Sequence, residues 1–142
     1  MAVQHMRIVL SAYLTNGQVN DAAEYLRGLG VSTGPYSVAP QPSPKAAVNL
    51  EIGNIEAAEF AEHGDEQWNH FEAAVGQCLS RFGEWLATVP TQNMDRLRDA
   101  GWKVWSIANL WIDQDQMDFH LPPVLSAQLG RLELELYVLS NE

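Results

Sequence analysis

Apolar and polar residues alternate along four stretches of the chain, and each stretch predicts a β-strand. The stretches are residues 7–14 (RIVLSAYL), 45–52 (KAAVNLEI), 102–112 (WKVWSIANLWI) and 132–138 (LELELYV). In each of them one set of alternate side chains is apolar, which is typical of a strand with one buried face. The region from 102 to 139 is the most regular part of the chain and predicts a βαβ-like unit, because a short proline-started segment separates its two strands.

Apolar residues that recur at steps of three and four predict a long helix over residues 65–88, which Pro90 ends. Its apolar stripe consists of Trp68, Phe71, Val75, Cys78, Leu79, Phe82, Trp85, Leu86 and Val89. Gly76 and Gly83 are seven residues apart and therefore lie on nearly one line of this helix. Since neither carries a side chain, another backbone is expected to come close along that line.

Three shorter helices are predicted from their start and stop signals. The first covers residues 21–30 and starts with a capping box. The second covers residues 91–100, with Thr91 as its cap and a glycine at its end. The third starts at a Pro-Pro pair and ends at Gly130.

This order of elements predicts an α+β fold in one domain, residues 1–142. We expect a four-stranded, mainly antiparallel or mixed sheet with helices packed on one face, in a β-α-β-(αα)-β-α-β order related to the ferredoxin-like arrangement. Residues 31–44 are rich in Ser, Gly and Pro, with four prolines. Prolines so closely spaced disfavour helix and central strand, so this segment is predicted to be a surface loop.

The same order, with particular residues, resembles a family of small uncharacterised bacterial domains. Members of that family open with a strand and a capped helix that ends in Leu-Gly, and they close with an alternating strand and a Tyr. The matching residues here are Leu29-Gly30, Gly101-Trp102, Leu121, Leu129-Gly130, the strand LELEL and Tyr137. The resemblance covers most of the chain and is specific over about its last third, although Pro122 stands where the family has Ser. It implies the fold and no catalytic residues, because the family has no assigned chemistry.

Charge and composition restrict the class of partner. Asp and Glu number 18 against 8 Lys and Arg, which gives a formal net charge of -10. A chain of this charge is expected to bind neither nucleic acid nor anionic membranes, and to attract a basic protein. The only cysteine is Cys78, and the N-terminus lacks the pattern of a signal peptide, so we expect a cytoplasmic protein.

One cluster of ionisable residues has spacing that suits a metal ion. Glu59, Glu62, His63, Glu66 and His70 would share one stripe if a single helix continued through them. Gly64 is expected to end a short acidic helix and break that stripe, so His63, Glu66 and His70 are weak metal candidates and solvated side chains are the favoured interpretation. The chain contains no glycine-rich phosphate loop, GxSxG elbow or HExxH motif, so we expect no cofactor and favour a protein without enzymatic activity over an enzyme.

The candidate working surface is the sheet face opposite the helices. Its predicted binding residues are Tyr13, Glu51, Trp105, Asn109, Trp111, Glu133, Glu135 and Tyr137. Aromatic residues mixed with acids and amides are typical of an interface, although a second layer or the proline-rich loop could cover them.

We therefore expect a non-catalytic protein-binding domain, for example an immunity-type protein that neutralises a basic toxin. The alternatives are a homodimer that binds a small ligand through the aromatic face, and a metal-dependent enzyme that uses the His63 and His70 cluster.

Overall fold

The computed structural model describes residues 3–15, 22–31, 33–38, 47–112 and 119–141. Its strands form one sheet in the order β2-β3-β1-β4-β5. The strand bounds are β1 Val3–Leu14, β2 Ser37–Val38, β3 Val48–Glu56, β4 Trp102–Ile112 and β5 Leu136–Asn141. The α+β class and the mixed sheet are confirmed. The fifth strand, β2, lies in the predicted loop and has only two residues, too few for an alternating pattern to reveal.

Strand directions confirm the βαβ unit near the C-terminus. β1 is antiparallel to both of its neighbours, β3 and β4, whereas β4 and β5 are adjacent and parallel. In a ferredoxin-like sheet another strand separates the parallel strands of each βαβ unit. The strand order here therefore differs from that arrangement.

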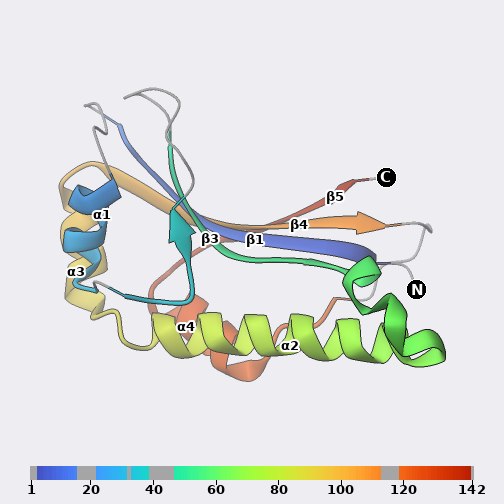
Figure 1. Ribbon diagram of the computed structural model, residues 1–142. Coiled ribbons are helices and arrows are strands. Elements are labelled where there is room, and N and C mark those ends of the chain that lie inside the picture. The colour runs from blue at the N-terminus through green and yellow to red at the C-terminus, as the bar shows by residue number, and fades with distance from the viewer. Residues whose placement is uncertain (1–2, 16–21, 32, 39–46, 113–118, 142) are drawn as a thin grey trace.

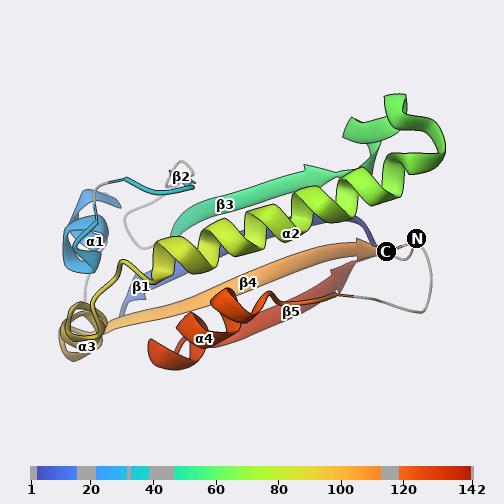
Figure 2. The same ribbon diagram turned by 90° about the horizontal axis from the view of Figure 1, so that it is seen from below.

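Helices lie on one face of the sheet (Figures 1 and 2). The helix bounds are α1 Ala22–Leu29, the 3-10 segment η1 Ala57–Glu66, α2 Gln67–Leu86, α3 Thr91–Asp99 and α4 Pro123–Arg131. The long helix α2 runs along the sheet with α4 beside it, and α1 and α3 lie together at one end. No described helix covers the opposite face.

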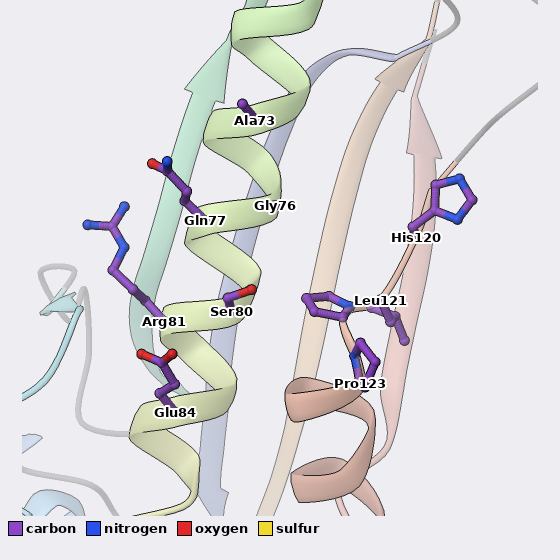
Figure 3. Close-up of a pocket in the computed structure, with 10 residues that line it drawn as sticks. Ala73, Gly76, Gln77, Ser80, Arg81, Glu84, His120, Leu121 and Pro123 are labelled. Atoms are coloured by element: carbon purple, nitrogen blue, oxygen red, sulfur yellow. The ribbon is translucent and has the colours of Figure 1, made fainter.

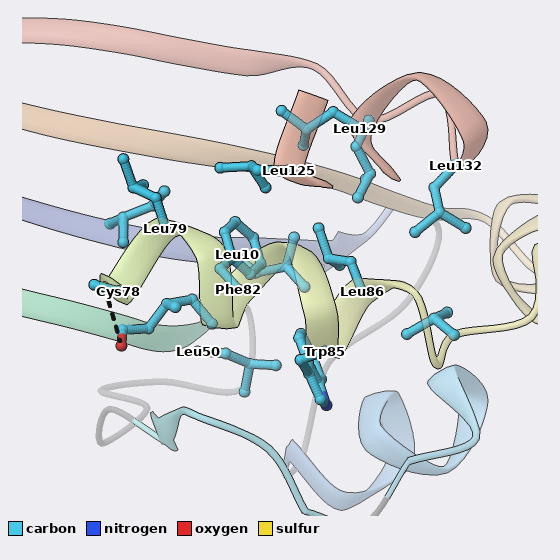
Figure 4. Packing of buried hydrophobic residues seen from close by; sticks show 14 of the residues in the cluster. Leu10, Leu50, Cys78, Leu79, Phe82, Trp85, Leu86, Leu125, Leu129 and Leu132 are labelled. Carbon is cyan, nitrogen blue, oxygen red and sulfur yellow. Dashed lines mark hydrogen bonds between the residues drawn. The ribbon is translucent and has the colours of Figure 1, made fainter. Parts of the chain in front are cut away.

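The core lies between this sheet face and α2 (Figure 4). Leu10 and Leu50 of the sheet and Leu79 and Phe82 of α2 have no exposed surface, and each contributes about 1.5–3 kcal/mol by its burial. The predicted apolar stripe of α2 is confirmed, since all its members are buried except the half-buried Trp68 and Val75. Cys78 belongs to this core, and burial raises the pKa of its thiol.

Several predicted element boundaries are wrong. Strand β3 ends at Glu56 rather than at residue 52, and the predicted capping box at Asp21 lies outside the described residues. Thr91 does not cap α3, because it is the first helical residue and Pro90 occupies the cap position. Gly130 does not end α4, which continues to Arg131.

The end of α4 is a Schellman turn with Glu133 at the left-handed position. Glu133 has φ 53°, the N–H of Leu134 donates to the carbonyl of Leu129 (2.8 Å), and the N–H of Glu133 donates to the carbonyl of Gly130 (3.2 Å). Leu129 and Leu134 are both buried, which supplies the apolar contact that usually accompanies this motif. Strand β5 therefore begins at Leu136, four residues later than predicted.

We expect alanine substitutions at the two glycines of α2 to change the free energy of unfolding in opposite directions. A Cβ at Gly83 would lie 2.7 Å from the backbone nitrogen of Leu125 in α4, whereas a Cβ at Gly76 would meet no described atom within 4 Å. Gly83→Ala should lower the free energy of unfolding by about 1–3 kcal/mol through overpacking. Gly76→Ala should raise it by about 1 kcal/mol through helix propensity. Urea unfolding followed by circular dichroism measures both, and a stable Gly83→Ala variant would contradict the close approach of α4.

Replacing Glu133 by glycine should stabilise the protein. A left-handed conformation costs a non-glycine residue roughly 1–2 kcal/mol, and glycine avoids this cost. Part of the gain is cancelled because glycine has greater entropy in the unfolded chain. We expect Glu133→Gly to raise the free energy of unfolding by about 0.5–1 kcal/mol. Glu133→Ala is the control, because it removes the carboxylate and keeps the left-handed strain. An equal gain in both variants would show that the carboxylate, and not the backbone, was responsible.

Candidate protein-binding surface

The sheet face that no described helix covers is called the open face. The pairing register places these residues on it: His5, Arg7, Val9, Ser11, Tyr13, Asn49, Glu51, Asn54, Glu56, Lys103, Trp105, Ile107, Asn109, Trp111, Tyr137, Leu139 and Asn141. Six of the predicted binding residues are therefore on this face, and Glu135 joins them through its contact with Tyr137.

Glu133 is not a residue of the strand face, contrary to the prediction. It lies in the turn after α4, with its carboxylate 4.0 Å from Nη1 of Arg98. The carbonyls of Leu132 and Glu133 both accept hydrogen bonds from Nη2 of Arg98, at 2.6 and 2.9 Å. The regular Leu-Glu alternation concealed this turn, because its apolar residues Leu132 and Leu134 are buried just as strand residues would be.

Three predicted residues line one hollow on the open face. Tyr13, Trp105 and Tyr137 surround a volume of about 400 Å³ together with Lys103, Ile107 and Leu139. The rings of Tyr13 and Trp105 meet edge to face with centroids 5.4 Å apart. Nζ of Lys103 lies 5.9 Å from the centroid of Tyr13, within the range of a cation–π contact.

A second hollow of about 400 Å³ adjoins the first and shares Lys103, Trp105 and Tyr137 with it. Its other lining residues are Arg98, Trp102, Val104, Glu133 and Glu135. The phenol of Tyr137 donates a 2.6 Å hydrogen bond to Glu135, which fixes the rim between the two hollows. This aromatic rim combines apolar area with hydrogen-bonding groups, as interface anchors do.

Trp111 forms a separate group at the far end of β4. Its ring stacks on His5, with centroids 4.1 Å apart and an interplanar angle of 15°, and His5 also contacts Asn54 and Glu56. Six residues separate Trp105 from Trp111, which is roughly 20 Å along a strand. The predicted surface is therefore one face with two aromatic groups.

Sequence reasoning missed His5, because the first strand was predicted to start at residue 7 and β1 starts at Val3. Met6 and Ile8 extend the alternation back beyond Arg7, and that signal would have assigned His5 to the same face as Trp111, although not to its side. Both Trp105 and Trp111 are half-buried.

The centre of the open face is shielded by its own side chains. Val9 and Ser11 are 3% and 1% exposed, although they point away from α2. Ser11 Oγ donates a 2.5 Å hydrogen bond to Asn49. Glu51 pairs with Arg7 at 3.5 Å, so this predicted binding carboxylate already has a cation beside it.

Most of the acidic residues lie outside the open face. Residues 46–80 contain acids and no Lys or Arg. Five of those acids lie on η1 and α2 rather than on the open face: Glu59, Glu62, Asp65, Glu66 and Glu72. On the open face Arg7 and Lys103 offset two of the three carboxylates, Glu51, Glu56 and Glu135, so that surface carries little net charge.

The weak metal candidates do not form a ligand set. Backbone angles are non-helical at Phe60 and Gly64, which confirms the break in the predicted stripe. The rings of His63 and His70 nevertheless stack, with centroids 3.6 Å apart, and His63 lies 3.5 Å from Glu62. Within the described part of the chain, no three His, Cys, Asp or Glu side chains are grouped so that they could hold a metal ion.

A larger hollow of about 850 Å³ lies between α2 and residues 120–123 (Figure 3). Gly76 leaves room there, and Leu121 and Pro123 form the other side. Its polar lining residues are Gln77, Ser80, Arg81 and Glu84 of α2 and His120 of the facing segment. The lining therefore combines apolar residues with a few polar side chains from both walls.

Comparisons with models of protein families, with curated proteins and with solved structures gave no significant match. Of the helices that are described, none combines the length and apolar character needed to cross a membrane.

The hydrogen bond to Glu135 should be visible in the titration of Tyr137. The bond, together with the charge of the carboxylate, raises the pKa of the phenol above its usual value of 10.0. Glu135→Gln should therefore let one tyrosine ionise at lower pH. Ultraviolet difference spectra of wild type and variant measure this, with Glu72→Gln, an exposed carboxylate on α2, as the control. Identical tyrosine titrations in all three proteins would contradict the hydrogen bond.

Proposed function

We propose that the protein is a non-catalytic binding domain that uses its open face to contact another protein. The observation that supports this best is the pair of adjoining hollows around Trp105 and Tyr137, on a sheet face that lacks a described helical cover. Aromatic residues set in shallow hollows are the usual anchors of protein interfaces.

The partner we propose is basic, and the concrete version is an immunity-type protein that neutralises a basic toxin in the bacterial cytoplasm. The net charge of -10 supports this choice, because it speeds the encounter with a cationic surface. The acidic side chains on η1 and α2 would supply this long-range attraction, and the nearly neutral open face would supply the short-range packing. Many interfaces separate these two contributions in the same way: charge sets the association rate, and buried aromatic residues set the dissociation rate.

The second candidate is a homodimer with a small ligand held by the aromatic face. The hollow lined by Tyr13 and Trp105 has a volume within the usual range for ligand sites, which supports this alternative. It offers few converging polar groups, however, since Lys103 is the only charged residue that lines it.

We expect Trp105→Ala to weaken capture of the partner. Wild type and variants would be immobilised, exposed to lysate of the source cells and eluted with salt, and the captured proteins identified by mass spectrometry. A basic protein retained by wild type should lose at least about 2 kcal/mol of binding free energy with Trp105→Ala, a decrease of about 30-fold in affinity.

Trp68→Ala is the matched control, because Trp68 is also half-buried and lies on α2 away from the open face. This variant should retain the partner. Capture of the same basic protein by Trp105→Ala, at wild-type affinity, would overturn the assignment of the open face.

A further inference from the structure

Strand β5 forms one edge of the sheet, and its outer side has no described strand paired to it. Its sequence, LYVLSN, contains no charged residue and no proline. Proteins usually blunt an exposed edge with charges, prolines, bulges or very short strands, because unpaired N–H and C=O groups attract another strand. The opposite edge follows that rule, because its strand β2 has only two residues. The β5 edge has none of these protective features.

Residues 137–139 of β5 are apolar and exposed, and they point alternately to the two faces of the sheet. Tyr137 is 49% exposed and Leu139 48%, and both lie on the open face beside Ile107 and Asn109. Val138 is 41% exposed and points to the helical side. A strand that covers this edge must therefore be apolar on both of its faces.

We infer that a second copy of this chain covers the edge, with the two β5 strands paired antiparallel about a two-fold axis. A second β5 is apolar on both faces, and its backbone can satisfy the unpaired groups of the first. It also brings no charge to the contact, which matters in a protein of net charge -10. A basic segment is the poorer occupant, because β5 offers no carboxylate to pair with it. This inference goes beyond the proposed function and does not depend on it.

The alternation of side chains specifies the register. A two-fold axis perpendicular to the sheet keeps both helical layers on one side, so opposed residues must point to the same face. Centring the axis on Val138 pairs the two copies of Val138 and places Tyr137 opposite Leu139 of the partner subunit. A centre at Tyr137 would oppose Glu135 to Leu139, and a centre at Leu139 would oppose Tyr137 to Asn141. The Val138 register buries the most apolar surface, and it joins the two sheets into one with both open faces on the same side.

The mass of the intact protein in solution tests the association. Light scattering after size exclusion, from about 1 to about 100 μM, brackets the affinity of an ordinary reversible dimer. Wild type should approach twice the monomer mass as concentration rises, and Val138→Lys should remain a monomer throughout. Val38→Lys is the matched control, because Val38 is 46% exposed on the other edge strand and should leave the dimer intact. Trp105→Ala should also remain dimeric, which separates this contact from the proposed binding face.

Engineered cysteines test the register in a Cys78→Ser background. Facing residues of an antiparallel pair have Cα atoms about 4.5–5.5 Å apart, which a disulfide can bridge. Val138→Cys should therefore form a covalent dimer on mild oxidation. Ser140→Cys should not, because its two copies would lie about 13 Å apart along the strands. A wild type that stays monomeric at the highest concentration, a dimeric Val138→Lys, or equal cross-linking at both positions would each overturn the inference.

Discussion

The packing of α4 on α2 determines where the C-terminal strand of the sheet can form. At Gly83 the backbones of the two helices come so close that a single added carbon would collide with Leu125. The guanidinium of Arg131 then ties the end of α4 to the end of α2, with Nη2 donating to the carbonyls of Leu86 (2.9 Å) and Val89 (2.7 Å). Because α4 is fixed at both points, the turn that follows it delivers the chain to the edge of β4. Ser106 completes the connection, since its N–H and hydroxyl both donate to the carbonyl of Glu135.

Sequence periodicity predicted those parts of the fold in which a regular helix or strand buries one of its sides. The stripe of α2 and the alternation of β4 were readable because each buries one side of a regular element. The end of α4 was not, because Leu132 and Leu134 are buried in a turn and produce the same alternation as a strand. A left-handed glutamate at residue 133 is also unexpected from sequence, since glycine is the usual residue there. The local sequence pattern indicates which residues are buried, but it does not specify the backbone geometry that buries them.

For the candidate surface, the sequence predicted which residues share a face but not which of them lie side by side. Alternation assigned Tyr13, Trp105 and Tyr137 to one face, and the structure brings all three around one hollow. That grouping requires β1 and β5 to be the two neighbours of β4, and strand order is a long-range property that a single sequence does not encode locally. The same limit explains why His5 was not associated with Trp111, which is more than a hundred residues away along the chain and stacks on it in space.

Covering the sheet on one side gives its two faces different roles. On the helical side the aliphatic residues of β1, β3 and β4 form the core, and Tyr13, Trp105 and Trp111 of the other side do not belong to it. A group of acidic residues lies on η1 and α2, away from the open face, where it contributes to the long-range field without desolvation at a contact on that face. A nearly neutral aromatic face on a strongly acidic molecule can therefore exclude water at a contact while the rest of the surface keeps the protein soluble. At the β5 edge the same separation bears on the proposed pairing of two copies: the strand carries no charged side chain, so the repulsion between the acidic surfaces acts from farther away and is screened by salt.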